Sequence, residues 1–591
     1  MAKNLPEVDV VIVGMGWTGG ILSKELSEHG LKVVALERGA PRSAEEDFSV
    51  PRIRNELEFT VRSGLMQDTK RDTLTVRNNV QQTALPMRKL GSFLLGEGLG
   101  GAGVHWNGHT WRWGDMEFKV RSMYEERYGK SYIPADMTIQ DWGISYQELE
   151  PYYDKFERTA GISAKAGNIG GKIQDGGNPF ESPRSAEYPL PPLEPSLSCD
   201  LFATAARQQG YSPFPMPTAN ASRPYTNPDG AKLGQCQYCG FCERYGCESN
   251  AKGSPLITVI PFAMKQSTFE LRTHAWVTRV HTDKDKKIAT GVTYVNLRTG
   301  EECFQPARIV ILAAYGLNNV HLMLTSGIGK PYDPETQQGV VGKNYAYQTG
   351  AGATLFFDDK QFNNFMSTGG LLNMVDDFHA NWNFDRSPHG FVGGATISGG
   401  NTNGRPIEYR PVPPGTPRWG KAWKESMAKW YNHSMNIGSS GSVMANRFNY
   451  LDLDPTYKNI FGQPLMRMTF DYKPNEHKIS TFAAGVVDRI GKSLNPTIMT
   501  PPAPRTAPWS VVPYQSTHNT GGTVMGTNPS NSVVNKYCQS WDAHNLFIMG
   551  ASLFNHNSAY NPTGPVGALA YWASDIIRRT YLKSPGPLVS A

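Results

Sequence analysis

The hydrophobic pattern of the chain is clearest near its N-terminus. Residues 10–13 form a continuous apolar run, an amphipathic segment follows, and a second apolar run ends at Glu37. Short apolar runs on both sides of a helical segment are typical of buried parallel strands joined by a crossover helix. The pattern therefore predicts a βαβ unit at the start of an α/β domain.

Three glycines stand between the first predicted strand and the helix, in the order Gly14-x-Gly16-x-x-Gly19. In such a unit the first glycine allows a tight turn, the second lets backbone approach a pyrophosphate, and the third lets helix and strand pack closely. Glu37 follows 23 residues after Gly14, where an acid can accept a ribose hydroxyl. The arrangement predicts a dinucleotide site, and both NAD and FAD use this motif.

Further apolar patterns are expected to complete this domain. One buried strand should rejoin the first sheet, two alternating segments should be strands, and the C-terminal region should add a strand and a helix. The buried strand is expected at 309–314 and is followed by a helix at about 317–325. The alternating strands are expected at 270–280 and 287–297. Near the C-terminus, the strand is expected at 546–549 and the helix at about 565–581.

Residues 350–500 differ in character, because strand-like segments alternate with loops. We expect an antiparallel sheet that forms a second, substrate-side domain. The predicted fold class is α/β with mixed α+β character, and a discontinuous Rossmann-type domain. The expected boundaries are 1–345 for the dinucleotide domain, with an irregular excursion at 115–235 and a cysteine loop at 235–250, then 346–500 for the substrate domain, 501–582 for the return to the first domain, and 583–591 for a flexible tail.

Charge and hydropathy exclude several classes of protein. The 58 basic and 52 acidic residues are interspersed, with a net charge of +6, which favours a mixed solvated surface over nucleic-acid binding. No apolar run reaches the roughly 18 residues that span a bilayer. The N-terminal apolar run lacks a preceding basic region and is read as a strand rather than a signal peptide. Taken alone, this favours the cytoplasm, although export with another subunit stays open.

Four of the seven cysteines fall within twelve residues, at Cys236, Cys239, Cys242 and Cys247. This clustering is unlike the spread of a disulfide framework. The spacing resembles an iron–sulfur loop, although zinc would also accept four thiolates, and free or disulfide-bonded cysteines are the remaining alternative. A glycine-rich stretch at 96–108, followed by aromatic and polar residues, suggests backbone that lies against a flat ligand.

Five segments occur in the order found in the glucose–methanol–choline (GMC) oxidoreductase family: 11–16, 98–101, 310–314, 518–526 and 561–563. The chain resembles this family over nearly its whole length. Within the family it is most similar to flavoprotein subunits of bacterial membrane-bound sugar and sugar-acid dehydrogenases. The resemblance implies FAD as the cofactor, held by a discontinuous domain that the C-terminal motifs complete.

The family motifs also imply which residues bind FAD. His105 matches a segment through which some members attach FAD covalently, and the alternative is an uncharged histidine packed against the ring edge. The implied cofactor-binding residues are Gly14, Gly16, Trp17, Thr18, Gly19, Glu37, Arg38, Gly98, Gly100, Gly101, Val104, His105, Asn107, Val277, Ala313, Ala551, Asn561, Pro562 and Thr563.

Two residues match the catalytic positions of the family. His518 corresponds to the histidine that accepts the hydroxyl proton of the substrate, and a base must lie within hydrogen-bond reach of that proton. Asn561 corresponds to the second catalytic position, where an amide can orient the hydroxyl and stabilise the developing alkoxide. A helix that begins near Thr563 would direct its positive end toward the flavin.

The resemblance favours iron–sulfur chemistry for the cysteine loop. Related dehydrogenases hold a three-iron cluster with three cysteines, and Cys236, Cys242 and Cys247 best preserve their spacing. Cys239 is then the spare, although this chain has one extra residue between its last two cysteines, and a four-iron cluster is the alternative. Such a cluster would divide the electron pair of the flavin for a one-electron acceptor.

The resemblance therefore implies a dehydrogenase for a sugar acid or sugar. D-gluconate is favoured, with fructose, sorbitol, 2-ketogluconate and glucosides as alternatives. The expected partners are a small subunit that carries the export signal and a membrane-anchored multihaem cytochrome c subunit, on the periplasmic face of the membrane. A cytoplasmic enzyme is the alternative location, and a non-catalytic flavin electron-transfer subunit is the alternative from another class.

Overall fold

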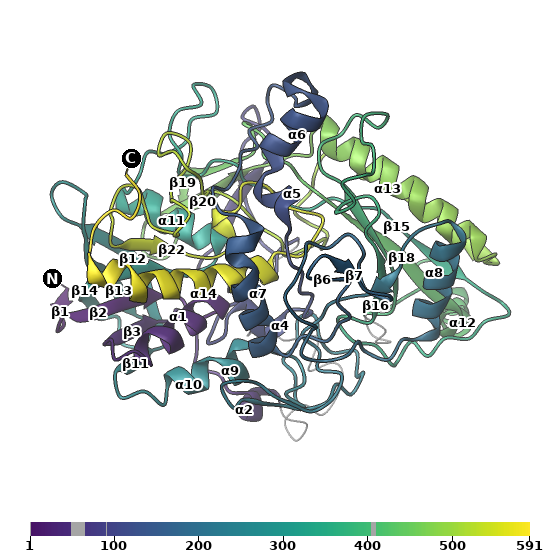
Figure 1. Cartoon of the computed structure of the whole chain (residues 1–591), viewed down its shortest axis with the longest axis horizontal. Helices are drawn as coiled ribbons and strands as arrows, with labels where there is room; N and C mark the ends of the chain where they lie inside the picture. The colour runs from purple at the N-terminus through teal and green to yellow at the C-terminus, as the bar shows by residue number, and fades with distance from the viewer. Residues whose placement is uncertain (1, 49–64, 90–91, 403–408, 591) are drawn as a thin grey trace.

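The computed structural model describes residues 2–48, 65–89, 92–402 and 409–590. Its N-terminal unit consists of β2 (Val8–Val13), α1 (Trp17–Ser27) and β3 (Val33–Leu36). The two strands are parallel, with Val10 opposite Val33. Every residue of α1 is buried, because the helix lies between this sheet and the C-terminal helix α14 (Thr563–Arg579), as Figure 1 shows. The predicted βαβ unit is present.

The first sheet has eight strands, and the long strand β14 (Glu302–Leu312) lies at its centre. The C-terminal half of β14 pairs in parallel with β2 and with β22 (Leu546–Ile548). The prediction that a buried strand at 309–314 rejoins the first sheet is therefore confirmed, except that the strand ends at Leu312. The helix α11 (Gly316–Ser326) follows β14, close to its expected bounds.

The alternating segments at 270–297 extend the same sheet. The single strand expected at 270–280 is divided into β11 (Phe269–Arg272), which is parallel to β3, and β12 (Ala275–Thr282), which is antiparallel to β13 (Ala289–Asn296). The break falls at His274, whose φ of 56° lies in the left-handed region. A residue in that conformation cannot continue a strand. The alternating pattern alone therefore did not reveal that the segment is divided into two strands with different partners.

The second sheet has six strands and is antiparallel throughout, as expected. Helices α8 (Leu197–Gln208) and α13 (Pro474–Ser493) cover one of its faces (Figure 1). The order of its strands is β21 (Ile498–Met499), β15 (Gly352–Phe356), β18 (Ser434–Gly441), β17 (Ala395–Gly400), β16 (Leu372–Val375) and β8 (Phe214–Pro215).

Two strands of the 346–500 region lie outside this sheet. The strands β19 (Tyr450–Lys458) and β20 (Pro464–Thr469) form a separate four-stranded sheet with β4 (Leu74–Arg77) and β5 (Leu85–Pro86). Strand β20 is parallel to β4, with Met466 opposite Leu74. Local alternation identifies a strand but carries no information about a partner so distant in the sequence.

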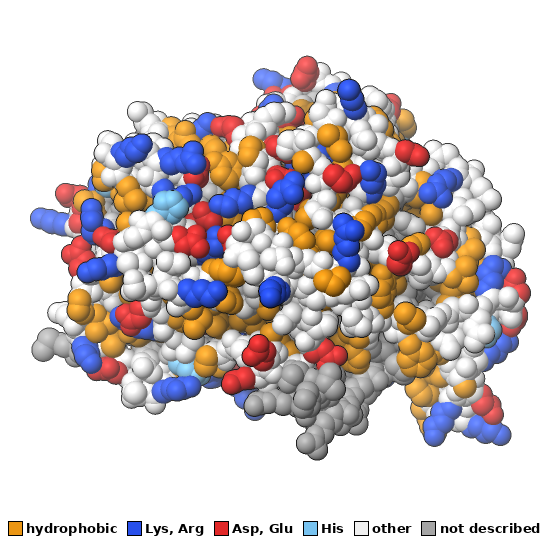
Figure 2. All heavy atoms as spheres, turned by 60° about the horizontal axis from the view of Figure 1, so that its bottom comes forward, with side chains coloured by type: hydrophobic (Ala, Val, Ile, Leu, Met, Phe, Trp, Pro, Cys, Tyr) orange, Lys and Arg blue, Asp and Glu red, His pale blue; other side chains and the backbone are white. Residues whose placement is uncertain are grey.

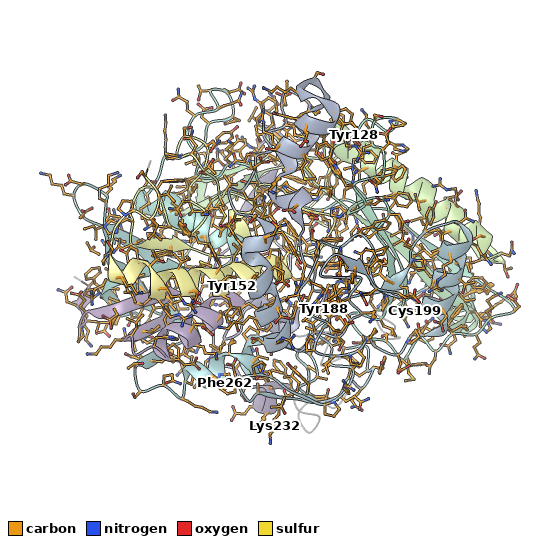
Figure 3. All side chains as sticks on the ribbon, viewed as in Figure 1. Tyr128, Tyr152, Tyr188, Cys199, Lys232 and Phe262 are labelled. Atoms are coloured by element: carbon orange, nitrogen blue, oxygen red, sulfur yellow. The ribbon has the colours of Figure 1, made fainter. Side chains whose placement is uncertain are left out.

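The excursion at 115–235 contains a long helix, and the C-terminal residues make specific contacts with the first domain. Helix α7 (Tyr146–Ala160) packs against α14, where Tyr152 donates a hydrogen bond to Asp575 (3.0 Å; Figure 3). In the expected flexible tail, the carbonyl of Gly586 accepts from the Gln539 side chain and the amide of Leu588 donates to it. These bonds hold the tail against the first domain.

Shorter elements connect these parts. No helix among the described residues is long and apolar enough to cross a membrane. Figure 2 shows acidic and basic side chains interspersed over one face. The shorter elements are β1 (Lys3–Asn4), α2 (Ala44–Phe48), α4 (Ala102–His105), α5 (Asp115–Phe118), α6 (Val120–Tyr128), β6 (Asn168–Ile169), β7 (Lys172–Ile173), β9 (Tyr225–Thr226), β10 (Lys232–Leu233), α9 (Pro255–Thr258), α10 (Ile260–Ala263) and α12 (Lys421–Trp430).

Candidate active site

One cavity of about 450 Å³ brings together most of the residues that the sequence analysis selected. Its volume lies within the roughly 300–1,000 Å³ of small-molecule and cofactor sites. Its walls come from the first sheet, the second sheet and the start of α14. The predicted residues in its lining are Gly14, Gly16, Trp17, Thr18, Glu37, Arg38, Gly101, His105, Asn107, Val277, Ala313, His518, Ala551, Asn561, Pro562 and Thr563.

Four predicted residues lie behind the lining: Gly19, Gly98, Gly100 and Val104. A Cβ on Gly19 would lie 1.9 Å from the Gly14 carbonyl oxygen, so only glycine permits this approach of helix and loop. A Cβ on Gly100 would lie 2.5 Å from Val104, and one on Gly98 would lie 2.5 Å from an arginine side chain. These residues determine the shape of the loops rather than the surface of the cavity.

The end of the cavity near β3 is polar and firmly braced. The Glu37 carboxylate accepts hydrogen bonds from the amides of Met15 (3.0 Å) and Gly39 (2.8 Å). Burial raises the pKa of Glu37, and these bonds partly oppose that effect. The Arg38 guanidinium lies 4.7 Å from the ring centre of Trp276. The role of Glu37 toward a ribose stays a prediction, and its observed bonds connect the loops after β2 and β3.

The lining fits a dinucleotide because several of its polar atoms lack partners. Trp17 Nε1, His105 Nε2 and Asn107 Oδ1 are buried without a hydrogen-bond partner in the described chain. Leaving such an atom unsatisfied costs about 1–3 kcal/mol, so a ligand that pairs with it is favoured. A Cβ on Gly16 would meet only the Gly100 carbonyl oxygen, at 3.9 Å, so space for a ligand remains at the phosphate position.

His105 is an uncharged ring in this lining. It ends α4 and is 3% exposed. Burial, assisted by the nearby Lys252 ammonium, lowers the pKa of His105 to about 3. The imidazole is therefore neutral at physiological pH and keeps a lone pair on one ring nitrogen. This state is compatible with both sequence-based alternatives, a covalent bond to FAD and simple packing.

At the opposite end of the cavity, His518 and Asn561 are in direct contact. Asn561 Nδ2 lies 2.9 Å from His518 Nε2, and His518 Nδ1 lies 2.7 Å from Gln348 Oε1. Trp111 donates its indole N–H to Asn561 Oδ1 at 3.1 Å. Gln348 Nε2 donates to the backbone carbonyl of Ala559 at 3.2 Å. Side chains from four separate segments thus form one continuous chain of hydrogen bonds.

The direction of these hydrogen bonds fixes the tautomer of His518. The Trp111 indole can only donate and the Ala559 carbonyl can only accept, so each bond between them has one orientation. Asn561 must then donate to Nε2, and His518 must donate from Nδ1 to Gln348. Burial, with a smaller contribution from repulsion by His109 when that ring is protonated, lowers the pKa of His518 to about 3. His518 therefore presents the Nε2 lone pair of a neutral base.

Three residues of this site were not predicted from the sequence, namely Gln348, Trp111 and His109. The His109 ring lies in the same lining, contacts the Gly369 carbonyl oxygen at 2.5 Å and is close enough to Asn561 for a hydrogen bond. Burial lowers its pKa, and both hydrogen bonds oppose that change. Trp111 and His109 follow the glycine-rich stretch, where aromatic residues were a usable signal. No local sequence pattern marks Gln348, because its partner His518 is 170 residues away in the sequence.

The start of α14 contributes a positive helix end. Pro562, Thr563 and Val566 line the cavity, so the first turn of this 17-residue helix faces it. A Cβ on Gly564 would lie 1.8 Å from the Trp111 carbonyl oxygen, so the helix start packs tightly on that loop. Unpaired N–H groups and the helix dipole favour negative charge at this position.

The cysteine loop lies against the glycine-rich loop of the cavity. The Arg244 amide donates to the His105 carbonyl (2.7 Å), and Asn107 Nδ2 donates to Glu243 (3.2 Å). The buried Lys252 ammonium donates to three carbonyls, those of Trp106, Cys242 and Tyr245, at 2.7–2.8 Å.

The four cysteines themselves are thiols without disulfides. The sulfurs of Cys236 and Cys242 each contact the Thr368 hydroxyl at 3.4 Å, Cys247 accepts from the Lys252 amide, and Cys239 is exposed. In the described ranges, no three histidine, cysteine or acidic side chains are grouped closely enough to hold a metal ion. The role of these cysteines as metal ligands stays a prediction.

Comparison with known proteins identifies the relatives of this chain. Residues 139–349 and 445–570 match the N-terminal and C-terminal family descriptions of GMC oxidoreductases. The chain is 47% identical to the gluconate 2-dehydrogenase flavoprotein of Pantoea cypripedii, covering 100% of this chain and 97% of that protein. It is 27% identical to 2-methyl-1,2-propanediol dehydrogenase of Mycolicibacterium austroafricanum, covering 98% and 97%.

Two more distant matches also extend over nearly the whole chain. The large subunit of fructose dehydrogenase from Gluconobacter japonicus is 23% identical, with 98% of this chain and 99% of that subunit covered. Among solved structures, pyridoxine 4-oxidase from Mesorbium loti matches with a TM-score of 0.55 at 14% identity, over 98% of this chain and 99% of that one. That structural match supports the fold alone.

Proposed function

Because the chain belongs to the GMC oxidoreductase family and is an FAD-dependent enzyme acting on CH–OH groups, we propose that it oxidises D-gluconate to 2-dehydro-D-gluconate. The 47% identity to a gluconate 2-dehydrogenase flavoprotein over both full lengths is the observation that supports this substrate. Bound FAD supplies the acceptor for the hydride that leaves the reacting carbon.

In this mechanism His518 accepts the hydroxyl proton at Nε2. A substrate hydroxyl that binds between His518 and Asn561 can donate to Nε2 and accept from Asn561 Nδ2. The amide then stabilises the alkoxide oxygen as its negative charge develops. The Nδ1–H of His518 remains bonded to Gln348, which holds the ring in place and stabilises the imidazolium. Asn561 itself has no basic atom and cannot take the proton.

The catalytic role of His518 is tested by flavin reduction without oxygen. In His518→Ala, the rate constant for bleaching of the flavin absorbance by gluconate should fall by about 10²–10⁴, the usual contribution of a general base, while FAD remains bound. His544→Ala is a matched control, because that ring bonds to Tyr581 instead. Unaltered reduction by His518→Ala would favour the non-catalytic electron-transfer alternative.

The substrate is tested with a panel of gluconate, 2-ketogluconate, fructose, sorbitol and glucosides and an artificial electron acceptor. We expect the highest kcat/KM for gluconate. A related dehydrogenase for a neutral sugar is the second candidate, because Arg38, at the β3 end, is the only arginine or lysine in the described lining of the cavity. A higher kcat/KM for fructose or sorbitol than for gluconate would establish that second candidate.

For the exit of electrons, we propose an iron–sulfur cluster on the cysteine loop and a cytochrome c subunit as acceptor. This proposal is supported by the four thiols of one loop, which hydrogen bonds hold against the glycine-rich loop of the cavity. The cluster, when bound, passes electrons singly. Iron and sulfide analysis with low-temperature EPR should show loss of the cluster in Cys242→Ser and its retention in Cys239→Ser. Zinc, or the absence of iron from protein purified anaerobically, would exclude it.

We further propose that a small subunit carries the export signal and that a multihaem cytochrome c subunit anchors the enzyme to the periplasmic face of the membrane. The name of the 47% identical relative, gluconate 2-dehydrogenase flavoprotein, is consistent with such an assembly. In cells that co-express the chain with both proposed partner subunits, fractionation should recover the chain with the membrane. Its recovery in the cytoplasmic fraction would support the alternative location.

A covalent bond between His105 and FAD is part of the same proposal. The unpaired Nε2 of this neutral ring in the cavity lining supports it. Protein precipitated with acid should retain the yellow colour and fluorescence of the flavin, and His105→Ala should release them. A colourless pellet from the native protein would leave non-covalent packing as the role of His105.

A further inference from the structure

The two faces of the six-stranded sheet differ in chemistry. On one face, Leu355, Ile397 and Ile437 are buried in a hydrophobic cluster with α8 and α13. Because strand residues alternate between faces, Thr354, Ser398 and their neighbours point to the opposite side. There the sheet presents small or polar side chains, namely Thr354, Thr396, Ser398, Asn436 and Ser440, with glycines between them.

A second cavity of about 490 Å³ lies along this polar face. It shares His109, Leu372 and Ser398 with the catalytic cavity, so the two are adjoining spaces over one sheet. Its complete lining is His109, Gly352, Ala353, Thr354, Leu372, Ser398, Gly400, Asn401, Thr402, Tyr409, Asn436, Ile437, Gly438 and Thr500.

The lining of this second cavity offers neutral hydrogen-bonding groups. It contains no aspartate, glutamate, lysine or arginine among the described residues. The Thr354 hydroxyl donates to Asn436 Oδ1 (2.8 Å), and Asn436 Nδ2 donates to the Tyr409 hydroxyl (3.3 Å), so both ends of the amide group are held in place. Within the described chain, the Ser398 hydroxyl makes no hydrogen bond and is available to a ligand. Neutral hydroxyl groups are the complementary ligand chemistry.

Gly438 provides the room in this cavity. Its φ lies outside the left-handed region, so the backbone does not require glycine. A Cβ at this position would meet only Ser398 Oγ at 3.9 Å and the Ala351 carbonyl oxygen at 4.0 Å. A larger side chain would therefore extend into open space beside Ser398 rather than into the protein core.

We propose that the second cavity is a binding subsite for the uncharged, polyhydroxylated part of the substrate, beyond the carbon that reacts at His518. This inference rests on the proposed function and specifies how it selects a chain of several hydroxyl-bearing carbons. Hydroxyls of the ligand bind Ser398 and the Asn436 amide, and a short alcohol reaches only the catalytic cavity. The subsite therefore contributes to the affinity for long substrates.

The test compares Gly438→Val with Gly485→Val. Gly485 lies on α13, behind the apolar face, and a Cβ there would meet only the flexible end of Arg489, at 3.7 Å. With an artificial acceptor, kcat/KM is measured for gluconate and for glycerate, a 2-hydroxy acid of three carbons. We expect Gly438→Val to lower the gluconate-to-glycerate ratio at least tenfold, mainly through the KM for gluconate, and Gly485→Val to preserve the ratio.

Ser398→Ala is a second variant, and we expect it to fold normally because the hydroxyl that it removes has no hydrogen-bond partner among the described residues. Its KM for gluconate should rise at least threefold. If the native enzyme oxidises gluconate but both substitutions leave the ratio and the KM unchanged, the subsite is overturned and the proposed function stands. If the native enzyme reduces its flavin with none of the polyhydroxylated substrates, the proposed function fails and the subsite with it.

Discussion

At the scale of single residues, the site depends on hydrogen-bond direction. A donor-only indole at Trp111 and an acceptor-only carbonyl at Ala559 orient the side chains between them, so that His518 keeps its Nε2 lone pair. Gln348 is therefore a positioning residue that acts through His518. The base and the amide could be selected from the sequence, because each lies in a local motif. Their orientation could not, because it requires a glutamine 170 residues away from His518.

Gln348→Glu tests this orientation through the pH dependence of flavin reduction. A carboxylate beside Nδ1 stabilises the imidazolium and so raises the pKa of His518 from its depressed value of about 3. Since the reaction needs the neutral ring, the acidic limb of the pH–rate profile should move to higher pH. Gln348→Leu should instead lower the rate constant about tenfold or more at every pH, because the ring loses its orienting partner. An unshifted acidic limb in Gln348→Glu would contradict the assignment.

At the scale of elements, closely spaced glycines serve different purposes. Gly19 allows α1 to approach the loop after β2, whereas Gly16 faces open space in the cavity. The sequence predicted the strand, loop and helix from a local motif, and the structure confirms them. The long helix α13 was not expected, although Ile479, Ala483 and Val487 have helical spacing and are buried. Its neighbours in the sequence are strands, and the alternating pattern of the region masked it.

Gly16→Ala and Gly19→Ala should therefore behave differently. The Cβ of Gly19→Ala would lie 1.9 Å from a backbone oxygen, so we expect a lower melting temperature by several degrees or misfolding. The Cβ of Gly16→Ala would meet only the Gly100 carbonyl oxygen, at 3.9 Å, so the apoprotein should keep its melting temperature while its FAD occupancy falls. Thermal unfolding and the flavin-to-protein absorbance ratio measure the two effects. Equal melting temperatures for both variants would refute this distinction.

At the scale of the whole molecule, buried polar groups join segments that are distant in the sequence. Lys252 is 1% exposed, and its ammonium holds the cysteine loop against the loop that carries His105. Three histidines are also buried, at positions 105, 518 and 556. Burial lowers the pKa of each to about 3. These groups connect the stability of the molecule to its charge state.

Lys252→Met should loosen the junction between the two loops. The substitution keeps most of the side-chain length but leaves three carbonyl oxygens without their charged donor, and a hydrogen bond to a charged group contributes about 1.5–3 kcal/mol. We expect a free energy of unfolding lower by at least about 3 kcal/mol in chemical denaturation, together with a lower iron content. Lys265→Met, on the surface after α10, is the control. Identical unfolding curves for the two variants would exclude the proposed role.

Acid should destabilise the protein through the buried histidines. Each has a folded pKa of about 3 and an ordinary pKa of 6.5, so between these values only the unfolded chain binds the proton. Their contribution to stability is complete above pH 6.5 and is lost progressively as the pH falls toward 3. In His556→Phe, the free energy of unfolding should decline less steeply over this range. A slope equal to that of the native protein would show that His556 is protonated in the folded state.

The sequence by itself determined the elements and residues whose signals are local. The βαβ unit, its glycines, His518 and Asn561 fall into short motifs, because neighbours in the chain create the turns and helix starts that they need. The tertiary structure decided which strands share a sheet and which distant side chains meet. Strand β20 pairs with β4, Trp111 orients Asn561 across 450 residues, and one face of the second sheet is polar while the other is packed. Such contacts depend on how the chain folds back on itself, and local patterns of hydrophobic and polar residues do not specify them.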